Sequence, residues 1–271
     1  CAILDNPPRL LPRHEFAAPP IEPITMNPNT LAEQSFAPGL NYRGIKAPLR
    51  LSDFRLIAFD MDSTLINIEC IDEVADAAGR KAEVAAITEA AMRGEITDYK
   101  ESLRRRVSLL AGVPAHALEE VYQQRLRLNP GARELVQACQ QAGLRTLLVS
   151  GGFTYFTDRV RDTLRLDFTR SNVFEIENGH LTGRMVDQPW GDICDGEEKR
   201  RMLQQTCDQL GITPRQAIAM GDGANDLPMM HLCADAGGVS VAYHAKPAVR
   251  AQARISIESG GLDRLLELVQ I

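Results

Sequence analysis

The sequence has no apolar run that approaches the ~20 residues needed to cross a membrane, so we expect no transmembrane span. No secretory signal, with its succession of basic, apolar and small residues, is visible at the start. Basic residues are not in excess: 30 Lys and Arg stand against 36 Asp and Glu, for a net charge of −6. Because nonspecific nucleic-acid binding needs a basic face, this charge argues against it, and an anionic substrate must be held by local cations.

Paired cysteines are also absent. The six cysteines are scattered singly, with no C-x-x-C pair: Cys1, Cys70, Cys139, Cys194, Cys207 and Cys233. We therefore expect small core side chains and neither disulfides nor metal ligands. Such cysteine usage is typical of the reducing cytoplasm, where we place the protein. The five histidines share no spacing typical of a metal site.

The remaining composition is that of an ordinary globular protein, with 44% apolar and 24% charged residues. A chain of 271 residues suits one domain with an insertion, or two modest domains. Prolines cluster in residues 1–50, where no period of 2 or 3.6 is sustained. We expect this segment to be an extended arm without regular elements, and its role is open.

From residue 51 onward, short apolar strands alternate with helices. The predicted strands are residues 56–59, 146–149 and 217–220, with a weaker one at 239–242. The Asn178-Gly179 pair inside the alternating segment 174–186 predicts a β-hairpin. This alternation indicates an α/β fold with a Rossmann-like core and a mainly parallel sheet. The core comprises residues 51–68 and 128–271, and the helical block 69–127 is too long for a simple crossover, so we expect it to form an inserted cap.

Polar residues follow three of the predicted strands, at the edge where an open parallel sheet binds its ligands. These segments are 60–64 (DMDST), 150–152 (SGG) and 221–226 (GDGAND). Any one of them alone would be an ordinary turn, since Asp, Ser, Gly and Asn are turn formers. Three such ends in one chain favour a functional site.

The residue types at these strand ends suit phosphate chemistry. Asp60 and Asp222 offer the hard oxygen ligands that Mg²⁺ prefers beside a substrate phosphate. Ser150 adds a hydroxyl and Gly151 a backbone N–H, and glycine lets the backbone approach a phosphate closely. Lys199 is the nearest plausible cation for a phosphate oxygen. The sequence therefore predicts a Mg²⁺-dependent phosphoryl site.

The motifs at residues 60–65 (DMDSTL), 148–153 (LVSGGF) and 221–229 (GDGANDLPM), together with Lys199, resemble those of the haloacid-dehalogenase-like phosphatases. Residues 68–73, 87–92 and 101–107 are similar to the helical cap of the members that hydrolyse O-phosphoserine. The resemblance covers roughly residues 50–271. It implies a phosphatase that converts O-phospho-L-serine to L-serine and phosphate, the last step of serine biosynthesis, with Mg²⁺ as cofactor. The sequence leaves the oligomeric state open, monomer or homodimer.

The resemblance also implies a role for each matching residue. Asp60 corresponds to the nucleophile that becomes aspartyl-phosphate, and Asp62 to the acid that protonates the leaving serine oxygen. The other correspondences form three groups: Mg²⁺ ligands Asp60, Asp222 and the backbone carbonyl of Asp62; phosphate and substrate contacts Ser150, Gly151, Lys199 and Asn225; and supporting residues Asp226, Met92 and Tyr99. Glu69 corresponds to the group facing the substrate ammonium, and Arg106 to the one facing its carboxylate.

Two departures from the family pattern concern the site. Tyr99 stands where an apolar Phe is common, and residues 190–196 do not follow the usual sequence before the lysine. We still assign the phosphate cation to Lys199, because Leu203 follows one helical turn later. Two other functions stay open: a phosphotransferase of the same fold with an alcohol acceptor such as homoserine, and a binding protein without turnover.

Overall fold

The computed structural model describes residues 32–92 and 95–270. Its centre is an eight-stranded sheet with the order β1-β2-β11-β10-β9-β4-β5-β6. Parallel pairing joins every neighbour from β11 to β6, with these bounds: β4 Leu56–Phe59, β5 Arg145–Phe153, β6 Phe168–Asn172, β9 Ala217–Gly221, β10 Val239–Tyr243 and β11 Ile255–Ile257. This confirms the predicted α/β class and its mainly parallel sheet.

Helices cover both faces of the sheet because successive residues of each buried strand point to opposite sides. Ile57, Phe59 and Leu148 pack on one face, beneath α5 (Ala132–Gln141) and α6 (Thr154–Leu164). Ala58 and Leu147 pack on the other, beneath α7 (Gly196–Leu210), α8 (Leu227–Asp235) and the short α9 (Pro247–Arg250). The central strands β4, β9 and β10 are thus buried along their whole length between two apolar layers.

The segment before residue 51 departs from the expectation of an arm without regular elements. Strands β1 (Gln34–Ala37) and β2 (Leu40–Tyr42) form an antiparallel pair, and β2 extends the main sheet along β11. Strand β3 (Leu49–Arg50) pairs with β12 (Val269–Gln270) near the carboxyl end of the chain. The prediction failed here because these strands have only two to four residues, too few to show a period, and because β2 and β3 pair with strands more than 200 residues later in the chain. Residues 1–31 lie outside the described part.

Two parallel strands, β6 and β11, were not expected either. The spacing of Leu262, Leu265, Leu266 and Val269 predicts a helix at the end of the chain, but the structure has 3₁₀ turns there, Leu262–Leu268, with Leu262, Leu265 and Leu268 buried in the core. Short 3₁₀ turns also precede β4 (Leu51–Asp53), β9 (Pro214–Gln216) and α8 (Ala224–Asp226). Five cysteines are free and buried, as predicted, and Cys1 is outside the described residues.

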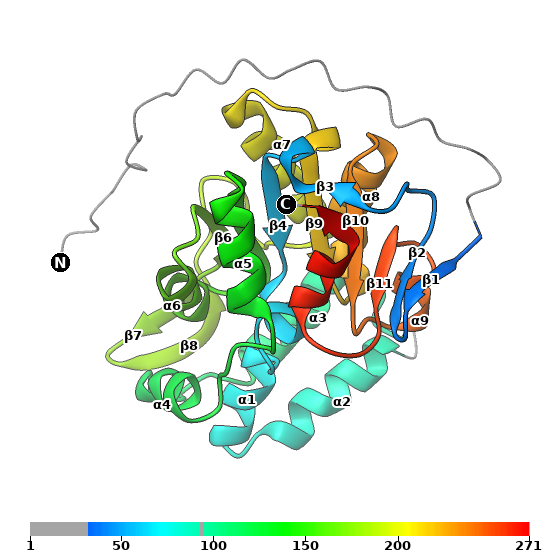
Figure 1. The fold of residues 1–271 in the computed structure, drawn as a ribbon. Coiled ribbons are helices and arrows are strands. Elements are labelled where there is room, and N and C mark those ends of the chain that lie inside the picture. Colours follow the sequence, from blue (N-terminus) through cyan, green and yellow to red (C-terminus); the bar gives the residue numbers. More distant parts are fainter. Residues whose placement is uncertain (1–31, 93–94, 271) are drawn as a thin grey trace.

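Of the five described α-helices between β4 and β5, the first four lie beyond one end of the sheet (Figure 1). They are α1 (Cys70–Ala77), α2 (Lys81–Met92), α3 (Tyr99–Ser108) and α4 (His116–Gln124), all within the range predicted for the cap. The chain enters and leaves this block through two linker segments, residues 65–67 and 127–129, which lie side by side. The amide of Asn67 donates to the Arg127 carbonyl (3.0 Å), and the amide of Asn129 donates to the Leu65 carbonyl (2.9 Å).

The predicted hairpin is present as β7 (Phe174–Glu177) and β8 (His180–Met185). It lies against the cap: the amides of Gly112 and Ala115 donate to the carbonyls of Leu181 and Gly179, each at 2.8 Å. Among the helices that the structure describes, none has the length and apolar character to cross a membrane.

Candidate active site

The three polar strand ends meet at one edge of the sheet because β4 lies between β5 and β9. Phe59 is aligned with Leu148 on one side and with Met220 on the other. Asp60 therefore leaves β4 beside the Ser150 segment and beside Asp222, and its amide donates to the Met220 carbonyl at 3.0 Å. At this point the chain order switches sides, with β5 on one flank of β4 and β9 on the other, which is where open parallel sheets bind ligands.

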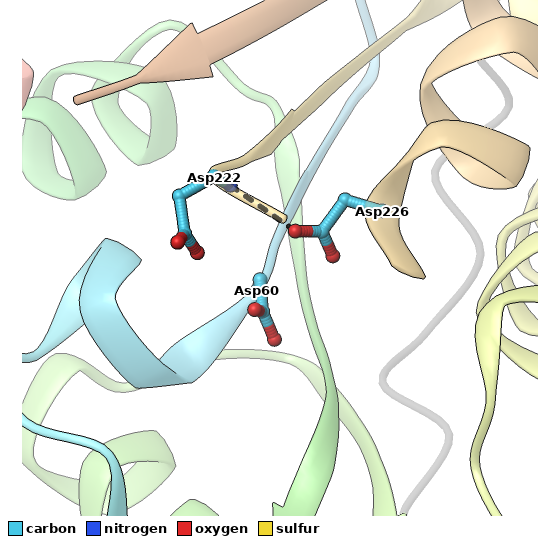
Figure 2. A group of neighbouring side chains, drawn as sticks. All are labelled: Asp60, Asp222 and Asp226. Atoms are coloured by element: carbon cyan, nitrogen blue, oxygen red, sulfur yellow. Dashed lines mark hydrogen bonds between the residues drawn. The ribbon is translucent and has the colours of Figure 1, made fainter. Parts of the chain in front are cut away.

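Three carboxylates converge at this edge. Figure 2 shows Asp60, Asp222 and Asp226, which each offer an oxygen within 4.8 Å of the others. Asp226 is already occupied: one of its oxygens accepts the Asp222 and Gly223 amides at 3.1 and 3.0 Å, and the other accepts from Lys199. Asp60 and Asp222 are therefore the two carboxylates with oxygens to offer a divalent cation, and Asp226 fixes the turn that presents Asp222.

Lys199 lies at the centre of this charge cluster. Its side chain is fully buried, and its Nζ lies 2.7 Å from Asp60 Oδ1 and 2.6 Å from Asp226 Oδ1. Burial alone would lower the pKa of Lys199, but the carboxylates of Asp226 and Asp60 outweigh it and hold the pKa well above its usual value. Asp195 caps the N-terminus of α7, the helix that carries Lys199, since its Oδ1 accepts the Glu198 amide at 2.9 Å. Lys199 thus stays a cation beside Asp60, in the register that the sequence suggested.

Burial and neighbouring charge raise the proton affinity of the free carboxylates. The pKa of Asp60 is raised well above its usual value, by burial first and then by the Asp226 charge. Burial, followed by the charges of Asp226 and Glu69, raises the pKa of Asp222 to about 7. A cluster that is so costly to ionise together fits a bound cation, because a positive ion would stabilise the charged forms.

Asp62 follows in the turn after β4 and faces the same space. Its Oδ2 lies 3.2 Å from where a Cβ on Gly152 would stand, and Ser150 Oγ lies 3.0 Å from that point. Burial, then the Glu69 charge, raises the pKa of Asp62 to about 8, against an opposing contribution from Cys70. A carboxyl group that keeps its proton near neutral pH is suited to act as a general acid.

The cap contributes residues from above the three strand ends. Glu69 Oε1 accepts a 2.7 Å hydrogen bond from Ser63, a residue with left-handed backbone (φ +56°). Burial raises the pKa of Glu69, and the positive charge of Arg106 opposes part of this shift, so the two side chains attract each other. Arg106 Nε is buried and has no hydrogen-bond partner in the described part of the chain. The cap thus presents one acid and one guanidinium with donor capacity to spare.

Tyr99, one of the two departures from the family pattern, lies against the predicted phosphate-binding segment of the core. Its hydroxyl would lie only 2.0 Å from a Cβ at position 151, so the phenol of the cap lies directly over Gly151 of the core. Any side chain at position 151 would collide with it. Asn225 folds back similarly over Gly223, with its Oδ1 2.4 Å from a Cβ built there. Met92 ends α2, and its side chain lies outside what the structure describes.

Two further polar side chains of the site were not predicted. Thr64 Oγ1 donates to Asp222 Oδ1 at 3.2 Å and orients this carboxylate, and its place in the DMDST motif was a signal for it. Asn172, at the end of β6, hydrogen bonds to both Gly151 and Cys194. Nothing in the sequence around Asn172 marked it, because β6 itself was not recognised.

Comparison with known proteins agrees with this geometry. A sequence profile of the haloacid dehalogenase-like hydrolases matches residues 57–231. A phosphoserine phosphatase of Polaromonas sp. is 73% identical over 234 residues, which cover 86% of this chain and 98% of the relative. A phosphoserine phosphatase of Haemophilus influenzae is 47% identical over 81% of this chain and 67% of its own.

Solved structures give the same result. A substrate-bound phosphoserine phosphatase superimposes with a TM-score of 0.72 and 34% identity, over 80% of this chain and 99% of its own. An unliganded probable phosphoserine phosphatase from Vibrio cholerae gives 0.70 and 41%, over 83% and 67%. These findings favour hydrolysis over the phosphotransferase and the binding protein that the sequence left open. The chain belongs to the haloacid dehalogenase-like hydrolases and, within them, to the family of the phosphoserine phosphatases.

Proposed function

We propose that this protein hydrolyses O-phospho-L-serine to L-serine and phosphate through a covalent phosphate ester of Asp60. The observation that carries the proposal is the buried Asp60 carboxylate, 2.7 Å from the Lys199 ammonium and adjacent to Asp222, beneath a cap that offers Glu69 and Arg106. One part of the site is suited to a phosphate and the other to a free amino acid.

The proposed chemistry has two displacements at phosphorus. In the first, Asp60 attacks, the bond from phosphorus to the serine oxygen breaks, and Asp62 gives that oxygen its proton. In the second, Asp62 takes a proton from water, which attacks the same phosphorus and frees the Asp60 carboxylate and inorganic phosphate. A pKa of about 8 lets Asp62 hold a proton at neutral pH before the first step. Lys199, Ser150 and the Gly151 N–H would hold the phosphate oxygens throughout.

Mg²⁺ fits the oxygen donors of the site. The carboxylates of Asp60 and Asp222 and the backbone carbonyl of Asp62 would hold it, while Thr64 orients Asp222. Such a donor set, with few carboxylates and room for substrate oxygens, is the one that Mg²⁺ prefers. When bound, the ion lets a dianionic phosphate approach an anionic nucleophile by neutralising their repulsion.

Substrate choice would come from the cap. Phosphoserine carries an ammonium and a carboxylate on one carbon. Glu69 supplies the negative charge for the ammonium, and Arg106 supplies the positive charge for the carboxylate. The guanidinium of Arg106 offers a planar donor pair that matches a carboxylate, which lysine would not reproduce. Its buried Nε has no partner among the described residues, so it is available to a ligand.

We predict that Arg106→Ala lowers kcat/KM for phosphoserine by about 30-fold or more, because loss of one member of a desolvated charge pair costs ~2–5 kcal/mol. With p-nitrophenyl phosphate, which has neither amino-acid charge, the loss is expected to be much smaller. The measurement is the ratio of the two losses, also made for Glu69→Gln. Arg105→Ala is the matched control: this neighbour on α3 is exposed and pairs with Glu101 at 2.7 Å.

Equal losses on both substrates in Arg106→Ala and Glu69→Gln would contradict the proposal that these residues bind the amino-acid part of the substrate. Phosphate release from phosphoserine with and without added homoserine would additionally reveal any transfer to an alcohol. The amounts of free phosphate and of serine are compared in both reactions. If less phosphate than serine forms when homoserine is added, and equal amounts form without it, hydrolysis is not the whole reaction.

A further inference from the structure

The Ser150 segment leaves the regular sheet at the active site. Strands β5 and β6 pair residue by residue up to Val149 and Arg170, and the next aligned pair is Phe153 with Asn172. Three residues of β5, positions 150–152, therefore face a single residue of β6, Ser171. A bulge of this kind takes backbone groups out of the ladder and re-aims side chains. It places Ser150 and Gly151 at the phosphate position, but it also leaves their backbone groups without the usual partners on β6.

Asn172 supplies a replacement for one of these lost bonds. Its Nδ2 donates to the Gly151 carbonyl at 2.8 Å, and its Oδ1 accepts the Cys194 amide at 2.8 Å. Asn172 is 1% exposed and Cys194 is fully buried, so the Cys194 amide would be left buried and unsatisfied without this side chain, while the half-buried Gly151 carbonyl would lose the group that orients it. The Cys194 N–H can only donate and the Gly151 carbonyl can only accept, so the orientation of the amide is unambiguous.

Fixing the Gly151 carbonyl also fixes the next amide, because C=O and N–H of one peptide point in opposite directions. That amide, the N–H of Gly152, donates to Ser150 Oγ at 2.9 Å. The hydroxyl oxygen therefore accepts a hydrogen bond from its own loop, and its proton is left to point elsewhere. The open direction is toward the site, since Ser150 Oγ and Asp62 Oδ2 both flank Gly152.

We propose that Asn172 is a positioning residue of the phosphate site: it orients the Gly151-Gly152 peptide, which in turn holds the Ser150 hydroxyl as a donor to a phosphate oxygen. This inference rests on the proposed phosphatase function, but it concerns the phosphate part alone and is indifferent to the leaving group. Lys199 has its own contacts to Asp60 and Asp226, and Asn172 touches the segment before its helix only through the Cys194 amide, so the proposal assigns the effect of Asn172 on the phosphate to Ser150.

The test is a double-mutant cycle on kcat/KM, with both phosphoserine and p-nitrophenyl phosphate as substrates. Ser150→Ala removes one donor to the transferring group, an interaction worth about 10²-fold in comparable sites. Asn172→Ala is expected to lose about tenfold or more on both substrates alike, but less than about threefold when Ser150 is already Ala. A residue that only stabilised the fold would lose as much in either background.

Ser171→Ala is the matched control, because Ser171 is the adjacent residue of β6 and is also buried and hydrogen bonded, to Thr157 at 2.7 Å. It is expected to lower the Tm while kcat/KM stays within about twofold of wild type. Where Asn172→Ala proves too unstable to assay, Asn172→Ser, which keeps a polar group in the same space, replaces it in the cycle.

Additive losses in the cycle, or an equal kinetic loss in Ser171→Ala, would overturn the assignment of Asn172. Failure of the proposed function looks different: wild type would then leave phosphoserine intact while still hydrolysing p-nitrophenyl phosphate. In that case the cycle on the synthetic ester still decides the role of Asn172.

Discussion

Asp60→Asn is expected to lower kcat by about 10⁴-fold or more, the largest effect of any single substitution in this chain, because an amide cannot act as the anionic nucleophile. Asparagine has nearly the same shape, so the packing of β4 and the position of Lys199 should be little changed. Two measurements check the prediction. Steady-state turnover of phosphoserine gives kcat, and acid quenching with ³²P-labelled substrate shows whether a phosphoenzyme forms.

Asp208→Asn is the matched control, since Asp208 is exposed on α7 and bonds to Gln204 on the same helix. Its activity should equal that of wild type. Near-native turnover in Asp60→Asn, or a phosphoenzyme of undiminished amount in that variant, would rule out the covalent mechanism assigned to Asp60.

Removal of divalent metal is expected to have the second largest effect. A metal that stabilises transition-state charge contributes several kcal/mol, so EDTA should lower kcat by about 10³-fold or more, and Mg²⁺ should restore it. Asp222→Asn should lose a similar amount and need far more Mg²⁺ for what remains. Asp235→Asn, at the exposed end of α8, is its control. Full activity in a preparation shown to be free of metal would contradict this prediction.

The pH dependence of metal binding follows from the same carboxylates. In the metal-free protein the pKa of Asp222 is raised to about 7, by burial before any other cause. Mg²⁺ binds the ionised form, so protonation of Asp222 competes with the metal as the pH falls below that value. Calorimetric titration with Mg²⁺ alone should show the apparent Kd rising about tenfold per pH unit below 7. A constant Kd from pH 8 to 5.5 would exclude Asp222 as a ligand.

The meeting of the strand-end residues of the candidate site could be predicted from the sequence because these residues follow buried strands. Asp60, Ser150 and Asp222 each end an apolar run, and parallel strands bring such ends to one edge. The register of Lys199 could be argued from the helical period of α7, and the structure places its Nζ on Asp60. Local patterns sufficed where local structure decides position.

The residues that escaped prediction depend on contacts across the sheet. Asn172 acquires its meaning only when β6 lies beside the bulge of β5, and no pattern around position 172 announces that pairing. Strand β2 was missed for the same reason, since it pairs with β11 more than 200 residues later. The helices of the cap could be predicted from the spacing of their apolar residues. The contact between Tyr99 and Gly151 could not, because it depends on how the cap lies on the core.

The two linkers of the helical block, residues 65–67 and 127–129, lie side by side and are joined by the hydrogen bonds Asn67–Arg127 and Asn129–Leu65. This arrangement has a consequence for how such a protein can be altered. A segment whose ends already lie within hydrogen-bond distance can be removed or exchanged without pulling the strands apart, because closing the gap costs little chain entropy. In this sense the helical block 69–127 is an insertion between β4 and β5 that leaves the main sheet uninterrupted. Grafting a different helical block between residues 68 and 128 would then retarget the enzyme to another phosphate ester while Asp60 and Lys199 stay where they are.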